Sequence, residues 1–275
     1  QSAPVFPMQY GYACVGQVEQ VGAAADAAWM GKQVFAFQPH ASHFIATPQS
    51  VIALPADISA ENAVFLANME TTVNLVQDGK PVLGEKVVVL GLGIVGLLLA
   101  KVLNRFPLAG LYAMDGSAAR RACALQSGVK LVADINATEA LQQVLTSAGK
   151  GSGADLIFEV SGAPASLNTA IALSGYASRI VIGSWYGNKS FPVDLGGTAH
   201  RNRLSITTSQ VSTLAPELSG RWDKERRFDM TWQLLQQLDP AQLITHRVPL
   251  REAAALYKHL HQNPADVLQA VFNYS

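Results

Sequence analysis

Hydrophobic and polar positions follow a regular alternation from Lys86 onward. Short apolar runs alternate there with segments whose apolar residues recur every three to four positions, which predicts strands joined by helices. The predicted strands are Val87–Leu90, Leu111–Met114, Leu131–Ala133, Ala154–Val160, Arg179–Gly183 and Leu204–Thr208. The predicted helices between them are Ile94–Arg105, Ala118–Gln126, Thr138–Ala148 and Ala165–Leu173. Such βαβ alternation favours an α/β fold with a doubly wound parallel sheet covered on both faces.

The pattern before Lys86 is different, because short strands and turns dominate it. Strands are predicted at Ala13–Val21, Gln33–Phe37, His43–Thr47 and Val51–Leu54, followed by helices from Ser59 to about Leu66 and from Glu70 to Gln77. The end of the chain predicts a helix at Asp229–Leu238, an extended piece at Leu243–Val248, a helix at Leu250–His261 and a strand at Val267–Asn273. We therefore expect a small β-rich unit formed by residues 1–62 and 246–275, with residues 63–245 as the parallel-sheet unit.

Composition and charge narrow the function classes. The 275 residues are 49% hydrophobic, and Lys+Arg and Asp+Glu number 20 each, so a general nucleic-acid or anionic-membrane surface is not expected. The apolar runs are too short to span a bilayer, and Cys14 and Cys123 form no Cys-x-x-Cys motif, which suits the reducing cytoplasm. The mixed-sign cluster Arg221–Arg227 is interpreted as a solvated turn.

The stretch Lys86–Leu103 carries the most informative motif. An apolar run ends in Gly91-Leu92-Gly93-Ile94-Val95-Gly96, and a helical pattern begins at once. In this pattern the first glycine allows the tight turn, the second lets the backbone approach a pyrophosphate and the third lets the helix pack on the sheet. Asp115 ends the next apolar run about twenty residues further on, where an acid is expected to bind the adenosine ribose. An ordinary glycine-rich turn is the weaker alternative, so we predict a dinucleotide site that prefers NAD, with NADP open because Arg120 and Arg121 follow.

These residues and their order resemble the medium-chain dehydrogenase/reductases, which include the zinc alcohol dehydrogenases. The segment Gly11-x₄-Gly16-x-Val18-x-x-Val21-Gly22, the Thr71-Thr72 helix, the Gly91 loop and Glu159-x-Ser161-Gly162 follow one another as in that family. The resemblance implies a Rossmann domain joined to a GroES-like domain, here partial because its upstream part is missing before Gln1. It also implies a set of cofactor-binding positions: Gly91, Leu92, Gly93, Ile94, Val95, Gly96, Asp115, Arg120, Ser161, Gly162, Gly183 and Ser184.

The departures from the family concern its catalytic zinc. Tyr12 stands where the family has a histidine ligand, Ala13 stands in place of the adjacent glutamate, and Ala67 falls at the later cysteine or glutamate ligand. A phenol and a methyl group are poor replacements for imidazole and thiolate on zinc. The chain is therefore interpreted as a zinc-free member, with no metal site expected.

Candidate catalytic residues are those that the resemblance brings to the cleft between the two units. Glu70 follows Ala67 by one helical turn, Thr71 occupies the family's nicotinamide-facing stretch, and Tyr12 takes the place of the lost ligand. Each has an ordinary alternative, since Glu70 can complement a helix dipole, Thr71 can cap or pack, and Tyr12 can pack. The expected substrate pocket contains Trp185, Tyr186 and His40, the aromatic pair forming a wall for an apolar or ring substrate.

The sequence thus predicts a zinc-independent, NAD(P)-dependent oxidoreductase that interconverts an alcohol and a carbonyl. A quinone or enone reductase is one alternative, and a non-catalytic dinucleotide-binding redox sensor is another. A small-molecule substrate is expected, with neither nucleic acid nor membrane as partner. A homodimer is predicted because Leu204-Ser-Ile-Thr-Thr-Ser209 resembles the family's edge strand, whose free backbone groups invite pairing.

Overall fold

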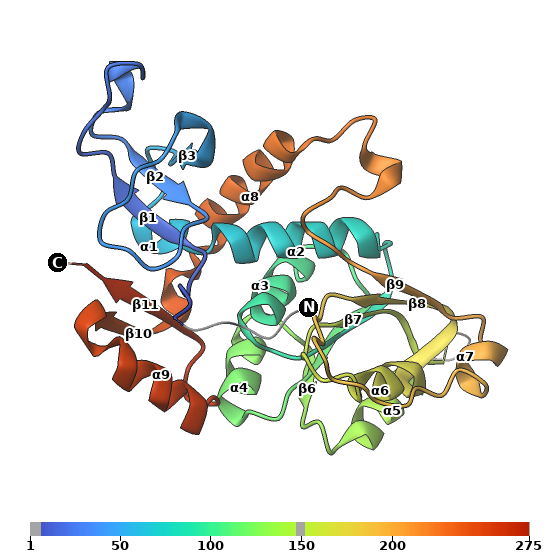
Figure 1. Cartoon of the computed structure of the whole chain (residues 1–275). Helices are drawn as coiled ribbons and strands as arrows, with labels where there is room; N and C mark the ends of the chain where they lie inside the picture. Colours follow the sequence, from blue (N-terminus) through green and yellow to red (C-terminus); the bar gives the residue numbers. More distant parts are fainter. Residues whose placement is uncertain (1–6, 147–151, 275) are drawn as a thin grey trace.

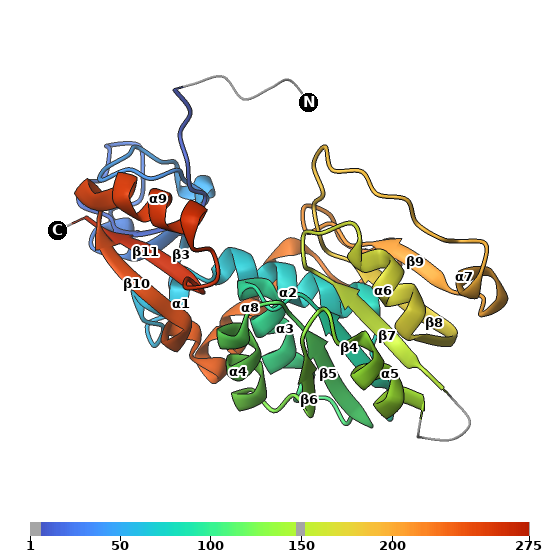
Figure 2. The same ribbon diagram turned by 90° about the horizontal axis from the view of Figure 1, so that it is seen from below.

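The computed structural model describes residues 7–146 and 152–274 of the chain. One part is built on a six-stranded parallel sheet, and the other on a three-stranded and a two-stranded sheet (Figures 1 and 2). No helix within the described ranges combines the length and apolarity needed to cross a bilayer.

The parallel sheet has the strand order β6-β5-β4-β7-β8-β9, so the direction of strand addition reverses between β4 and β7. Its strands are β4 (Lys86–Leu90), β5 (Gly110–Met114), β6 (Leu131–Ala133), β7 (Ala154–Glu159), β8 (Ser174–Ile182) and β9 (Ser205–Thr208). All neighbouring pairs in this sheet are parallel. Ligands of such open sheets bind outside the carboxyl ends of the strands, at the point of reversal.

Successive residues of each strand face opposite sides of this sheet. Both faces of β4 carry apolar residues, and helices cover both of them. The helices are α1 (Ala60–Ala63), α2 (Leu66–Gly79), α3 (Ile94–Leu103), α4 (Ala118–Gln126), α5 (Thr138–Thr146), α6 (Ser166–Leu173), α7 (Thr198–Arg201), α8 (Lys224–Leu238) and α9 (Ala253–Gln262). Val87 and Val89 pack in one core with α2, α3 and α8, whereas Val88 and Leu90 pack in a second core with α5 and α6. This is the doubly wound arrangement that the sequence predicts.

The β-rich part combines both ends of the chain. Strands β1 (Cys14–Gln17), β2 (Gln33–Ala36) and β3 (Val51–Ala53) form an antiparallel sheet, and β10 (Ile244–Pro249) pairs in parallel with β11 (Gln269–Asn273). Short 3₁₀ helices occur at Ala27–Trp29, Pro48–Ser50, Pro216–Leu218, Pro240–Leu243 and Leu250–Glu252. Helices α2 and α8 lie between this part and the parallel sheet in both views (Figures 1 and 2).

Most predicted elements are confirmed, and several differ. Strand β8 begins at Ser174 instead of Arg179, and β1 ends at Gln17 instead of Val21. Residues 43–47, predicted as a strand, are a loop, and the short helix α7 was not predicted. Helix α8 begins at Lys224 instead of Asp229, because Asp223 caps it by accepting a hydrogen bond from the backbone N–H of Arg226. Residues 147–148 of the predicted helix 138–148, and residues 1–6 of the expected β-rich unit, lie outside the described residues.

The division of the chain at residues 62/63 and 245/246 stays a proposal. The first boundary falls between Asn62 and Ala63 of α1 and the second inside β10, shortly after the strand begins at Ile244.

Candidate active site

The glycine loop after β4 is shaped by close backbone approaches. Gly91 has φ +96°, and a Cβ there would lie 2.5 Å from the Ser161 Cα. A Cβ on Gly96 would lie 2.0 Å from the Gly91 carbonyl oxygen, so α3 packs directly on the turn. By contrast, a Cβ on Gly93 would meet no described atom within 4 Å. The loop is therefore rigid at Gly91 and Gly96 and open at Gly93, where a pyrophosphate needs room.

The start of α3 provides the hydrogen-bond donors of this site. Gly93 is the N-cap residue of α3, and no side chain caps the helix. The first N–H groups of a helix have no intrahelical partner and carry the positive end of the helix dipole. Gly93, Ile94 and Val95 are half-buried, so this helix end is accessible from the carboxyl edge of the sheet. The geometry fits an anionic phosphate group.

Asp115 ends β5 beside the glycine loop. Its side chain is 8% exposed, and its Oδ2 accepts a 2.7 Å hydrogen bond from the backbone N–H of Leu92. Its Oδ1 accepts from the N–H of Ser117 at 2.7 Å. The carboxylate is thus fixed at the edge of the turn, on the β5 side of the sheet reversal. Carboxylate oxygens have further lone pairs available for ribose hydroxyls.

The two arginines of α4 have different partners. Arg120 was expected at a cofactor-binding position. Its Nη2 instead donates to the backbone carbonyls of Pro264 at 2.9 Å and Val267 at 3.4 Å, which ties α4 to the segment before β11. Arg121 donates to Asp134 Oδ2 and to the Asp115 carbonyl, both at 2.7 Å. Both guanidinium groups thus have protein partners, and a role for Arg120 in cofactor binding stays a prediction.

The ends of β7 and β8 form the opposite side of the site. Glu159 is fully buried, and its Oε1 accepts from the backbone N–H of Ser161 at 2.8 Å. Its Oε2 accepts a 2.5 Å hydrogen bond from the Tyr186 hydroxyl. Burial, followed by the hydrogen bond and the charge of Glu159, raises the pKa of Tyr186 well above its ordinary value. The Ser184 hydroxyl accepts from the N–H of Gly162 at 2.8 Å and thereby joins the two loops.

The two predicted wall aromatics differ in exposure. Tyr186 is half-buried and committed to Glu159, whereas the neighbouring Trp185 is 78% exposed. Trp185 follows the carboxyl end of β8, the edge of the sheet that also carries the glycine loop. The indole is therefore free to contact a ligand.

Tyr12, which the resemblance matches to a zinc-ligand position, contacts Asn68. The Tyr12 hydroxyl donates to Asn68 Oδ1 at 3.2 Å, and Asn68 directly follows Ala67 in α2. Desolvation raises the pKa of the Tyr12 phenol, so the hydroxyl stays protonated at neutral pH. No group of three or more His, Cys, Asp or Glu side chains in the described ranges could hold a metal ion. The residues at these positions do not fit a catalytic zinc, whose ligands are imidazole, thiolate and carboxylate.

Glu70 requires a correction. It was expected to face the cleft as a catalytic acid, but it is 3% exposed, and its Oε1 accepts hydrogen bonds from Arg227 Nη2 at 2.7 Å and Nε at 3.1 Å. Its carboxylate is thus engaged by a buried guanidinium and does not face the cleft. The Thr71 hydroxyl donates to the Ala67 carbonyl at 3.0 Å and keeps lone pairs with which to accept, so its role beside the nicotinamide stays a prediction.

His40 also requires a correction. Instead of lining a pocket with Trp185, it packs edge-on against Phe272 at 4.8 Å between ring centroids, and its Nε2 lies 3.0 Å from the Tyr257 hydroxyl. Burial lowers the pKa of His40, which favours the neutral ring. His43, which lies in the loop that was predicted as a strand, pairs with Glu19 at 3.4 Å on the surface. His40 therefore helps to pack the β-rich part.

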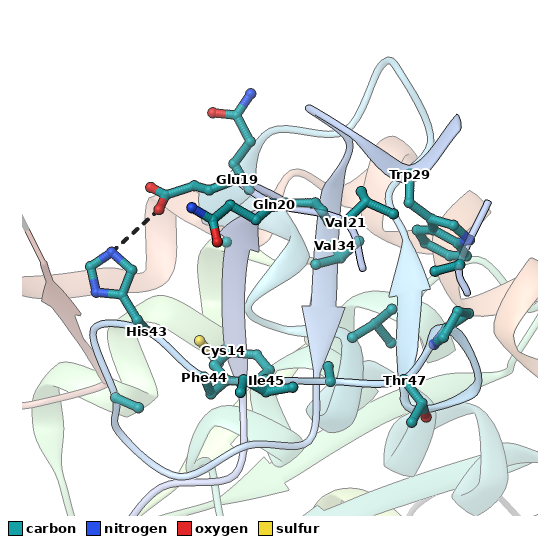
Figure 3. A pocket seen from close by; sticks show the side chains of 18 of the residues that line it. Cys14, Glu19, Gln20, Val21, Trp29, Val34, His43, Phe44, Ile45 and Thr47 are labelled. Carbon is teal, nitrogen blue, oxygen red and sulfur yellow. Dashed lines mark ion pairs between the residues drawn. The ribbon is translucent and has the colours of Figure 1, made fainter. Parts of the chain in front are cut away.

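A cavity of about 640 Å³ lies in the β-rich part, apart from the predicted site residues (Figure 3). It is lined by β1 and residues 18–22, by residues 41–48 and by Tyr274 among others, with His43 and Glu19 at one side. None of the predicted site residues and no strand of the parallel sheet lines it. This cavity is not part of the candidate active site.

Arg227 is a buried charged residue next to Glu70 that the sequence did not indicate. The cluster 221–227 was interpreted as a solvated turn, yet Arg227 is 1% exposed and is the largest fully buried side chain. The signal was present, since Arg227, Thr231 and Leu235 recur every four residues on the buried face of α8. Beginning the predicted helix at its N-cap Asp223 would have placed Arg227 on that face.

Comparisons with known proteins match this geometry. The sequence model of the family described as "Zinc-binding dehydrogenase" matches residues 91–225. The chain is 26% identical over 230 residues to D-guloside 3-dehydrogenase of Escherichia coli K12, covering 82% of this chain and 65% of that protein. It is 26% identical over 204 residues to L-threonine 3-dehydrogenase of Bacillus subtilis, covering 72% of this chain and 54% of that protein. The chain thus spans less than two thirds of the length of these curated relatives.

Solved structures share the fold. Galactitol-1-phosphate dehydrogenase from Escherichia coli superposes with a TM-score of 0.78 at 18% identity, covering 95% of this chain and 83% of that one. An alcohol dehydrogenase from Escherichia coli CFT073, complexed with NADH, superposes with a TM-score of 0.75 at 18% identity, covering 94% of this chain and 82% of that one. The fold is that of Rossmann and GroES-like domains, and the chain is similar in sequence to zinc-type dehydrogenases of the medium-chain dehydrogenase/reductase family.

Proposed function

We propose that this protein is an NAD-dependent oxidoreductase that moves a hydride between a small alcohol or carbonyl substrate and the nicotinamide without zinc. The single observation that carries the proposal is the Gly91–Gly96 loop, open at Gly93, with Asp115 fixed beside it. Relatives named as dehydrogenases of sugars, amino acids and diols support the reaction class.

The bound dinucleotide would supply or accept the hydride, and the chain would bind and orient it. The N–H groups at the start of α3 would hold the pyrophosphate, and Asp115 would accept hydrogen bonds from the adenosine ribose. A 2′-phosphate beside Asp115 would bring like charges together, so NAD is favoured over NADP. Arg120, Ser161, Gly162, Gly183 and Ser184 remain the proposed flanking positions.

Zinc independence is proposed from the residues at the family's ligand positions. The Tyr12 hydroxyl is hydrogen-bonded to Asn68, and the side chains of Ala13 and Ala67 have no atom that could coordinate a metal. Tyr12 would take over part of the task by donating its proton, or a hydrogen bond, to the oxygen that becomes negative when hydride is added to a carbonyl. A positioned acid of this kind commonly contributes about 10²–10⁴-fold to a rate.

Reduction of an activated double bond, as in a quinone or enone, is the second candidate. The observation that favours it is the exposed indole of Trp185, which offers a flat surface for a ring. A non-catalytic redox sensor remains the third alternative, since the family's metal ligands are replaced.

Steady-state oxidation of NADH across a panel of aldehydes, ketones, quinones and enones separates these candidates. Turnover of aldehydes or ketones that is unchanged by a chelator supports the main proposal. Turnover of quinones or enones alone supports the second candidate, and tight NADH binding without any turnover supports the sensor. About one tightly bound zinc per chain by elemental analysis would contradict zinc independence, because a catalytic zinc site holds one ion on three protein ligands.

We further propose a homodimer in the cytoplasm. Strand β9 is at one edge of the parallel sheet, and its residues Ser205–Thr208 are all exposed. An exposed edge pairs readily with a second copy. The two cysteines are free thiols, which supports a reducing compartment. Light scattering at micromolar concentration tests the dimer, which a monomeric mass would contradict.

A further inference from the structure

The guanidinium of Arg227 joins α8 to two other parts of the molecule. Its Nε and Nη2 donate to Glu70 Oε1 of α2 at 3.1 and 2.7 Å, and its Nη1 donates to Asn74 Oδ1 of the same helix at 2.8 Å. The remaining contacts go to backbone carbonyls, from Nη2 to Val211 at 2.5 Å and from Nη1 to Thr213 at 3.2 Å. All five N–H donors of the guanidinium thus have an acceptor.

A second link secures the beginning of the same loop. Asn74 Nδ2 donates to the Ser209 hydroxyl at 2.8 Å and to Asp78 Oδ2 at 3.0 Å. The backbone N–H of Ser209 continues the sheet by donating to the Ile182 carbonyl at 2.8 Å. The segment 209–213 is therefore held at Ser209 through Asn74 and at two further carbonyls through Arg227.

This segment lies at the edge of the sheet where a dinucleotide binds. It follows the carboxyl end of β9, and in a parallel sheet all carboxyl ends share one edge with the glycine loop. Asp115 lies on the β5 side of the sheet reversal. Because it is the expected partner of the adenosine ribose, the adenosine half of the dinucleotide extends toward β5. The other half of the dinucleotide must extend toward β7, β8 and β9, where the segment 209–213 begins.

A buried ion pair is not needed to pack two helices. Apolar side chains of similar volume often replace such a pair without loss of stability. They cannot, however, donate hydrogen bonds to two carbonyls of one loop. The feature that requires arginine here is the simultaneous contact with Glu70, Val211 and Thr213.

We propose that Arg227 is a positioning residue for the nicotinamide half of the cofactor site. Anchored by Glu70, it fixes the segment 209–213 in the conformation that accepts the cofactor. This inference rests on the proposed function, because it presupposes that a nicotinamide dinucleotide binds at the glycine loop.

The test replaces the pair Arg227→Met and Glu70→Met together, so that no unpaired buried charge remains. We expect a melting temperature close to that of the unchanged protein. The affinity for NADH should fall about tenfold if the freed segment adopts the binding conformation about a tenth of the time. Affinity for ADP, which reaches only the Gly91 loop and Asp115, should be unchanged. Arg247→Met with Glu61→Met removes an exposed ion pair, 2.6 Å between Arg247 Nε and Glu61 Oε1, and should change neither affinity.

The outcomes separate this inference from the proposed function. If the unchanged protein binds neither NADH nor ADP, the proposed function fails and this inference falls with it. If the unchanged protein binds both, the Arg227 inference is overturned by a double variant that binds NADH equally well. A folded double variant that loses ADP and NADH affinity in parallel also overturns it, because the role would then be structural. If the double variant does not fold, Arg227→Lys is used instead. Lysine keeps the positive charge but cannot make all the guanidinium hydrogen bonds, so this variant should show the same selective loss of NADH affinity.

Discussion

Strand β4 in the middle of the parallel sheet and strand β1 of the β-rich part differ in burial. In β4 the residues from Val87 to Leu90 are at most 3% exposed, whereas β1 has no buried residue at all. The parallel-sheet part holds the cofactor motif by backbone contacts that only glycine allows. In the β-rich part Tyr12 stands at the position that the resemblance matches to a histidine ligand, and surface loops occupy much of the chain. The comparison teaches that the proposed cofactor site depends on backbone geometry, while the proposed substrate chemistry depends on a few exchangeable side chains.

The largest effect is expected from Gly96→Ala. A Cβ 2.0 Å from the Gly91 carbonyl oxygen forces α3 away from the turn. Overpacking of this kind costs about 1–3 kcal/mol of the free energy of unfolding. NADH binding should be lost as well, because the donors of α3 move. Thermal unfolding and calorimetry measure the two effects.

Gly93→Ala is the matched control for that change. Its Cβ meets no described atom within 4 Å, so the melting temperature should stay the same. The same Cβ enters the space that a pyrophosphate needs, and NADH affinity should fall. Equal NADH binding by Gly93→Ala and the unchanged protein would show that the cofactor does not approach this turn.

Tyr12→Phe addresses the β-rich part and removes only the hydroxyl. We expect kcat for carbonyl reduction to fall about 10²-fold, the lower range for a positioned acid, with the NADH dissociation constant unchanged. Tyr12 is 60% exposed, so stability should change little. Rapid-mixing kinetics with the best substrate of the panel measures the rate. A kcat equal to that of the unchanged protein would remove Tyr12 from the mechanism.

The smallest effect concerns the pH dependence of stability. Burial lowers the pKa of His40 below its ordinary value of 6.5, so the folded state resists protonation that the unfolded state accepts. The contribution of His40 is complete above pH 6.5 and is lost as the pH falls through the folded-state pKa. His40→Phe should remove this part of the pH dependence. Denaturant unfolding of both proteins between pH 7.5 and pH 5 tests this, and parallel curves would contradict it.

The success of sequence prediction differs between the two parts for physical reasons. Local periodicity was sufficient to predict the parallel strands and most helices. The glycine loop was recognisable because its glycines are required by local turn geometry and close packing. The partners of Glu70 and Tyr186 were not predictable, because Arg227 and Glu159 come from other elements that tertiary packing brings near. The loop 43–47 has strand-like composition, but no neighbouring strand pairs with it in the described structure.

Calorimetric titration of the chelator-treated protein with NADH and with NADPH tests the central claim most directly. A phosphate placed against the Asp115 carboxylate costs about 1–3 kcal/mol even with partial screening, or about fivefold and more in affinity. The account predicts that NADH binds more tightly than NADPH by at least that factor and that the chelator does not change its affinity. Tighter binding of NADPH, or no binding of either dinucleotide, would contradict it.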